Sequence, residues 1–206
     1  MKTNDAVPYR IFQLVAAHPA LDFINTLDWR FRESGPEELL QTYGDLVRFT
    51  EQSNLLTPSQ SQQLLRASTT RKAAKVFQES KELREALAET VYSMVNGRTV
   101  AATPLKTLER QFHSARLHQA LQGKNSHLEW SFAGAEDALE LPLWLLALSA
   151  SDLLTSDTMS GVRVCDNHEC QWLFLDTSKN HTKRWCDMKV CGNRMKARRF
   201  KAQRAS

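Results

Sequence analysis

The stretch CDNHECQWLFLDTSKNHTKRWCDMKVC, residues 165–191, decides how the end of this chain folds. It holds all four cysteines, in two pairs whose members are separated by four residues: Cys165 with Cys170, and Cys186 with Cys191. In a reducing compartment such a pattern favours a metal over disulfides. Two close pairs joined by a longer arm can surround one tetrahedral ion. We therefore predict one Zn²⁺ per chain, bound by the four cysteines, with His168 and His181 as less favoured substitutes.

The residues between and after the cysteine pairs predict a small zinc module. Trp172 and Phe174 alternate with leucines, the chain turns through DTSKN, and it returns to Trp185, which is typical of a β-hairpin. The hairpin has too little apolar material to fold alone, so a metal must stabilise it. A helix is expected from about residue 194 to 203. The order of knuckle, hairpin, knuckle and helix predicts a treble-clef-like zinc finger.

Charge separates this end of the chain from the rest. Residues 161–206 contain 11 Lys and Arg against four Asp and Glu, whereas residues 1–160 contain 16 against 19. Such an asymmetry favours a polyanionic partner. Seven basic residues are the nucleic-acid-binding candidates: Lys183, Arg184, Arg194, Lys196, Arg198, Arg199 and Lys201. A solubilising tail and an acidic protein surface are the alternatives to nucleic acid.

The first part of the chain is expected to be mainly helical. Apolar periodicity predicts helices over 19–29, 72–96, 103–121 and 138–154, the last apolar nearly all round and therefore central. A capping box at Thr57 and Gln60 opens another helix. Leu128, Trp130 and Phe132 alternate as in a strand with one buried face. The fold class is thus mostly α with a few short strands: a helical domain over 1–158, joined near 155–161 to the zinc finger over 159–206.

One polar group stands out in the helical part. Asp22, Asn25 and Trp29 fall on one face of the helix predicted over 19–29. They are interpreted either as a buried clamp that holds helices together or as a small-ligand pocket. An enzyme site around Asp22 and Asn25 is a weaker hypothesis, because no nucleophile–base pair or open metal site accompanies them. We expect the protein not to be an enzyme.

Membrane and export signals are not predicted. No apolar run approaches the roughly 20 residues that span a bilayer. The first residues have neither the basic region nor the long apolar region of a signal peptide. A cytoplasmic location is expected.

The cysteine segment resembles the CGNR zinc finger, which takes its name from the tetrapeptide at 191–194. The likeness includes both cysteine pairs, Phe-Leu-Asp at 174–176, Arg-Trp-Cys at 184–186 and Lys-Ala-Arg-Arg at 196–199. The preceding part is similar to the ABATE domain at residues 18–26, at 43–46 and at 142–144. Together the two resemblances imply a bacterial, stress-linked transcription regulator whose finger binds DNA and whose body senses a ligand.

The leading functional hypothesis is a zinc-dependent regulator that binds duplex DNA through the last helix. Its body would dimerise, sense a small-molecule effector, or both. In a second hypothesis the protein is an RNA-binding module in which Trp172, Phe174 or Trp185 stacks on bases. A protein-docking zinc module and a thiol redox switch are further alternatives.

Overall fold

The computed structural model describes residues 11–135 and 137–205. The first ten residues lie outside the described part, so the prediction that the chain starts without a signal peptide falls partly on them. The elements follow in the order α1 (Pro19–Asn25), β1 (Leu27–Asp28), β2 (Glu37–Glu38), α2 (Tyr43–Gln52), α3 (Pro58–Leu65), α4 (Arg71–Val95), α5 (Ala102–Leu117), β3 (Ala120–Lys124), β4 (His127–Ser131), α6 (Leu141–Thr155), η1 (Asp157–Gly161), β5 (Val162–Val164), β6 (Leu173–Leu175), η2 (Met188–Gly192) and α7 (Asn193–Ala205). The expected fold class, mostly helical with short strands, is confirmed.

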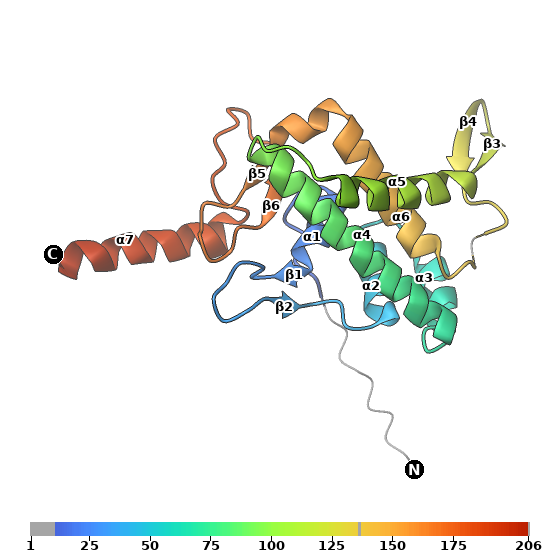
Figure 1. Ribbon diagram of the computed structural model, residues 1–206, viewed down its shortest axis with the longest axis horizontal. Coiled ribbons are helices and arrows are strands. Elements are labelled where there is room, and N and C mark those ends of the chain that lie inside the picture. Colours follow the sequence, from blue (N-terminus) through green and yellow to red (C-terminus); the bar gives the residue numbers. More distant parts are fainter. Residues whose placement is uncertain (1–10, 136, 206) are drawn as a thin grey trace, which may run out of the picture.

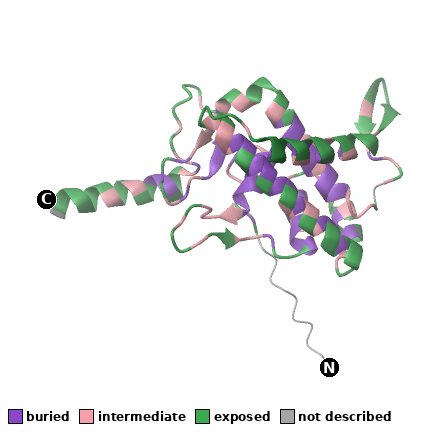
Figure 2. Cartoon of the chain, viewed as in Figure 1, coloured by how far each residue is buried: buried purple, intermediate pink, exposed green. Residues whose placement is uncertain are grey.

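Helix α6 lies at the centre of the helical body and contacts α1, α2, α4 and α5. Its sequence is apolar on every side, so it can be buried by several helices at once. Leu146 and Ala147, near its middle, are fully buried. In Figure 2 the buried residues gather where these helices meet. The predicted central helix is therefore confirmed.

Capping residues set several helix boundaries as the sequence predicts. The Thr57 hydroxyl accepts a hydrogen bond from the Gln60 N–H at 3.3 Å, and the Gln60 side chain accepts one from the Thr57 N–H at 2.9 Å. This is the expected capping box of α3. Helix α4 begins after its N-cap Thr70 and ends just before Gly97, whose φ of +63° suits a glycine at a helix end.

Helix α1 is shorter than predicted, because it ends at Asn25 and not near Trp29. Leu27 and Asp28 leave the helix to pair with Glu38 and Glu37 of β2. Trp29 then adopts a left-handed conformation with φ of +50°. A left-handed residue cannot continue a right-handed helix, so Asp22, Asn25 and Trp29 do not share a helical face.

The strand predicted near residue 130 exists, but its apolar face is not buried. β4 pairs with β3 in an antiparallel hairpin that projects beside the end of α5 (Figure 1). Leu128 is 67% exposed and Trp130 is 64% exposed, whereas Phe132, just after the strand, is buried. The helix predicted over 103–121 ends earlier, at Leu117, and Leu121 lies in β3. In the part of the chain that the structure describes, nothing covers Leu128 and Trp130, so the alternation of these apolar residues does not mark a core face.

The C-terminal hairpin differs from the one expected between the cysteine pairs. β6 pairs with β5, in the register Val162 with Leu175 and Val164 with Leu173. The first cysteine pair therefore occupies the turn of this hairpin. Trp185 lies in the loop that follows and takes no part in a strand. The segment with the first cysteine pair reverses the chain between β5 and β6, and this brings the residues just before Cys165 alongside β6.

The body and the cysteine segment share one hydrophobic core. Phe174 and Leu173 are fully buried in the same cluster as α1, α4 and α6. The segment at 155–161 ends α6 and forms η1, and the carbonyl of Gly161 accepts a hydrogen bond from the Asp176 N–H at 2.9 Å. The connection is thus packed. Helix α7 extends away from this core, at the opposite end of the molecule from the β3–β4 hairpin (Figure 1).

Candidate metal centre and basic helix

The first cysteine pair is held in a tight turn between β5 and β6. The Cys165 N–H donates to the carbonyl of Trp172 at 2.8 Å, and the Cys170 N–H donates to the carbonyl of Asn167 at 2.8 Å. Gln171 follows with a left-handed φ of +52°, which turns the chain back into β6. Backbone hydrogen bonds therefore orient both sulfurs toward the same side.

The second pair lies at the start of α7. Asp187 caps the turn between the two cysteines: its side chain accepts a hydrogen bond from the Val190 N–H at 3.0 Å, and its carbonyl accepts one from the Cys191 N–H at 3.0 Å. A Cβ on Gly192 would lie 2.3 Å from Sδ of Met188 and 3.5 Å from the Trp185 ring. Such a Cβ would displace the flexible side chain of Met188, so Gly192 lets Met188 pack close to the backbone directly after Cys191.

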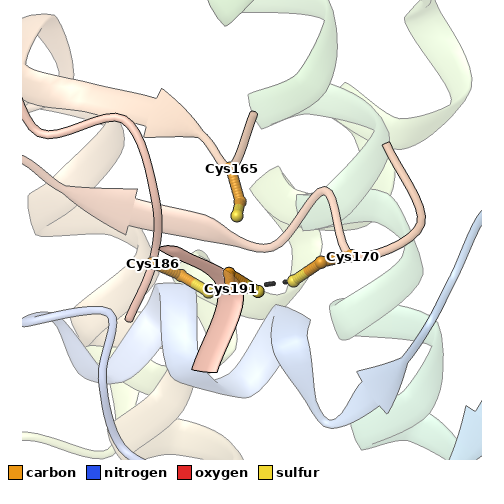
Figure 3. Close-up of side chains that lie close together, drawn as sticks. All are labelled: Cys165, Cys170, Cys186 and Cys191. Atoms are coloured by element: carbon orange, nitrogen blue, oxygen red, sulfur yellow. Dashed lines mark hydrogen bonds between the residues drawn. The ribbon is translucent and has the colours of Figure 1, made fainter. Parts of the chain in front are cut away.

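The four sulfurs point toward one another in the close-up of Figure 3. They lie within 4.8 Å of one another, and all four cysteines are buried. Sγ of Cys186 is 3.7 Å from Sγ of Cys170 and 3.8 Å from Sγ of Cys191. A Zn–S bond of about 2.3 Å in a tetrahedron separates any two sulfurs by about 3.8 Å. The donor set therefore fits one Zn²⁺ closely.

The same distances exclude disulfides in this arrangement, because a disulfide requires sulfurs about 2.05 Å apart. All four cysteines are free. A closed set of four thiolates has no open coordination position, so zinc bound here would be structural. The ion would hold the knuckle at 165–170 against the start of α7.

The surroundings shift the four thiols in different directions: they lower the pKa of Cys165 and Cys191 and raise the pKa of Cys170 and Cys186. Side-chain hydrogen bonds, first from Cys165 and then from Cys170 and Cys186, lower the pKa of the Cys191 thiol. Nδ2 of Asn167, which is fully buried, approaches Sγ of Cys191 at 3.5 Å and acts in the same direction. Metal binding requires the deprotonated ligands, so the lowered pKa values assist it at Cys165 and Cys191. Sequence reasoning missed Asn167; its only signal is its place inside the first knuckle.

Five long-range hydrogen bonds attach the metal centre to the body. The Asn25 amide pairs with both backbone groups of Leu173, and the Leu175 N–H donates to the carbonyl of Ala16 at 2.8 Å. The Tyr92 hydroxyl donates to the carbonyl of Gln171 at 2.8 Å. Nε1 of Trp172 donates to the Asp28 carboxylate at 2.8 Å. The knuckle is therefore oriented by α1, by α4 and by the segment after α1.

The three candidates for a ligand pocket lie at different places. The Asp22 carboxylate accepts the Ala16 N–H at 3.0 Å, and Asn25 is bound to Leu173, so both serve the buried packing of α1. Trp29 instead borders a cavity of about 170 Å³ between the body and the metal centre. Three of the cysteines and Arg194 also line this cavity. The structure thus does not bring the three side chains together.

The seven basic candidates divide by what they touch. The Arg194 guanidinium lies 5.1 Å from the centroid of the Trp29 ring, and Nζ of Lys183 lies 4.7 Å from that of Phe174. Arg184 pairs with Asp166 at 2.5 Å, and Arg198 pairs with Glu169 at 2.6 Å. Lys196, Arg199 and Lys201 are exposed and form no ion pair within the described residues.

Comparisons with known proteins identify both parts of the chain. Residues 17–157 match the model of the ABATE family, whose description is "Putative stress-induced transcription regulator". The chain belongs to the ABATE family. Residues 162–204 match the CGNR zinc finger, so the buried four-cysteine cluster is the Zn²⁺ site of that finger. A search among curated proteins found no match.

The printed description of the family is that of a regulator and names no enzymatic activity. Within the described residues, no helix is both long and apolar enough to cross a bilayer.

Proposed function

We propose that this ABATE protein is a zinc-dependent transcription regulator that binds duplex DNA through α7. The observation that carries the proposal is the position of this helix. It projects from the body, is exposed along most of its length, and contains six Lys and Arg but no Asp or Glu (Figures 1 and 2). A positive helix held away from its own protein can approach a polyanion without a clash.

The physical chemistry of α7 also favours a partner. A helix of 13 residues with a polar surface is only marginally stable in water without packing. Here the metal centre anchors its first turn, and the rest lacks apolar cover. The major groove of B-DNA accepts an α-helix, and its phosphates neutralise basic side chains. Binding to duplex DNA would therefore stabilise the projecting turns.

The contacts within the protein divide the basic residues by role. Lys196 and Arg199 are three positions apart, so they lie on the same side of α7, away from Glu169 and Trp29. We infer that these two make the main contacts to phosphates or base edges. Arg194 and Arg198 lie on the other side, where Trp29 and Glu169 bind them and orient the helix. Lys201 follows on that side, beyond their reach.

The test is a binding titration of the full-length, zinc-loaded protein with mixed-sequence duplex DNA and single-stranded RNA between about 50 and 200 mM salt. We expect steep salt dependence with duplex DNA. Lys196→Ala and Arg199→Ala should each weaken binding, and each lost phosphate contact should reduce the salt slope by about one. Lys106→Ala, an exposed lysine of α5, is the matched control and should change neither quantity.

Two outcomes would contradict the proposal. Unchanged affinity of the Lys196→Ala, Arg199→Ala double variant at low salt would remove α7 from the interface. A preference for single-stranded RNA would favour the alternative module. The burial of Trp172 and Phe174 removes two of the three rings considered for stacking on bases, and the third, Trp185, is half-buried against the core.

A further inference from the structure

We propose that a groove between α4, α5 and α6 binds an amphipathic organic anion, a molecule with an apolar body and one carboxylate or similar group. The groove encloses about 600 Å³. That volume is in the range of small-molecule sites, which are often formed between helices of a bundle. None of the candidate residues from the sequence lines it.

The walls of the groove are mainly apolar. α5 contributes Leu105, Leu108 and Phe112, at helical spacing, while Met94 comes from α4 and Leu154 from α6. Leu105 is 47% exposed and Met94 is 39% exposed. Large apolar side chains that remain exposed along one groove mark a binding surface more often than scattered ones do. They suit the apolar body of a ligand.

The charge at one end of the groove selects the sign of the ligand. The Arg116 guanidinium donates to the Ser151 hydroxyl at 3.1 Å and forms no ion pair within the described residues. It is thus a cation beside apolar surface without a carboxylate partner. His113 lies one turn away on the same helix, and Glu109 lies about 10 Å from Arg116 along the axis. A ligand carboxylate would bind next to Arg116.

The length of the groove limits the size of the apolar body. Arg116 and Leu105 are eleven residues apart on α5, which corresponds to about 16 Å along the helix. A ligand with its anionic group at Arg116 would therefore extend its apolar body past Phe112 toward Leu105. A straight alkyl chain of medium length, or two fused aromatic rings with a substituent, fits this distance.

Two walls of the groove continue directly into the zinc finger. Leu154 and Thr155 end α6 just before η1 and β5, which lead to Cys165. In α4, Tyr92 lies between the lining residues Thr90 and Met94 and donates to the carbonyl of Gln171, next to Cys170. A ligand that shifts either wall would move the first knuckle. The role of this ligand as an effector rests on the proposed DNA binding, but its binding to the groove does not.

The binding test uses full-length, zinc-loaded protein and two probes, 8-anilinonaphthalene-1-sulfonate and decanoate. We expect a saturable rise in the fluorescence of the first probe at one site per chain, and its displacement by decanoate. Decanol and decyltrimethylammonium should displace it at least about tenfold more weakly, because neither has an anion for Arg116. Failure of decanoate to compete, or equal competition by the cation, would overturn the proposal.

Variants locate the site. Arg116→Gln should weaken decanoate at least about fivefold while decanol is unaffected, and Leu105→Gln should weaken both. Both side chains are exposed, so these variants should remain folded. Trp130→Ser is the control for the other exposed apolar surface, the β3–β4 hairpin, and should leave both affinities unchanged. Loss of probe binding in Trp130→Ser, or an unchanged decanoate affinity in Arg116→Gln, would overturn the proposal.

The effector role is measured separately, as the affinity for duplex DNA with and without saturating decanoate. We expect a shift of at least about threefold in the wild type and none in Arg116→Gln. An unchanged DNA affinity in the wild type would overturn the effector role. Absence of DNA binding at every salt concentration would overturn the proposed function. The fluorescence result would still decide whether the groove binds an organic anion.

Discussion

The side-chain amide of Asn25 pairs with both backbone groups of Leu173, 148 residues further along the chain. Its Nδ2 donates to the carbonyl at 2.8 Å, and its Oδ1 accepts from the N–H at 3.0 Å. Asn25 ends α1, and Leu173 begins β6, the strand that follows the first cysteine pair. One asparagine thus acts as a strand partner for β6 and fixes the zinc finger to the body.

Replacement of Asn25 by leucine should therefore be strongly destabilising. The variant would leave the N–H and carbonyl of Leu173 buried without partners, and each such group costs about 1–3 kcal/mol. We expect a loss of about 2–4 kcal/mol in the free energy of unfolding, measured by urea denaturation of zinc-loaded protein. Asn180→Ala, at an exposed asparagine, is the control. A loss below about 0.5 kcal/mol for Asn25→Leu would show that the amide is not needed for this attachment.

Removal of zinc should destabilise the whole chain, because the cysteine segment belongs to the core of the body. A chelator should lower the midpoint of thermal unfolding for the body helices as well as for the finger, in one transition. The binding energy of a structural zinc, on the order of several kcal/mol or more, is lost from the folded state. The measurement is far-UV circular dichroism against temperature with and without chelator. An unchanged body transition would mean that the two parts fold independently.

The ligand set can be tested by counting metal. Cys191→Ser should retain less than one zinc per chain in a mild chelator, since a serine hydroxyl replaces a thiolate. His168→Ala is the control, because His168 lies exposed beside the first knuckle and four cysteines already complete the site. Loss of zinc from His168→Ala would instead place the histidine among the ligands.

Trp29 should affect DNA binding without touching DNA. Its ring supports the Arg194 guanidinium at the start of α7, and a cation–π contact contributes about 0.5–2 kcal/mol. We expect Trp29→Ala to weaken binding about threefold to tenfold with an unchanged salt slope, because no phosphate contact is lost. Fluorescence anisotropy across a salt series measures both quantities. Trp130→Ala is the matched control; an equal effect of the two variants would contradict the role given to Trp29.

Asp22 should make stability depend on pH. Burial raises the pKa of its carboxyl from 3.8 to about 6, against the opposing effect of hydrogen bonds from the N–H groups of Ala16 and Val15. Below pH 3.8 the group is protonated in both states. As pH rises from 3.8 to about 6, the unfolded chain releases the proton that the folded chain still holds. Its contribution to stability therefore falls through this window, by about 3 kcal/mol in total, and stays low above it.

The comparison that isolates this effect is Asp22→Asn with wild type, both zinc-loaded. Between pH 5 and pH 7 the variant should gain about 1 kcal/mol in unfolding free energy relative to wild type. Urea midpoints at the two pH values measure the difference. Asp157→Asn, at an exposed aspartate, should show no such gain. A constant difference between Asp22→Asn and wild type at both pH values would contradict the raised pKa.

Local patterns in the sequence determined the elements and the metal ligands. A cap at Thr57 or Thr70, and the apolar residues of α6, act within a few turns of helix, so their effect can be predicted without a fold. Cysteines separated by four residues likewise form a knuckle by local geometry, and the prediction of a four-cysteine zinc site is confirmed.

Only the tertiary structure decided which segments meet. From the sequence, Asn25 is expected on a polar face of a helix, yet its side chain binds Leu173 on a distant strand. β6 pairs with β5 and not with the residues near Trp185, and Trp130 remains exposed although its strand alternates like a buried one. Such pairings join residues far apart in the chain, and they depend on which surface is already covered. Periodicity reports which side of an element is apolar, whereas the packed body determines whether anything lies against that side.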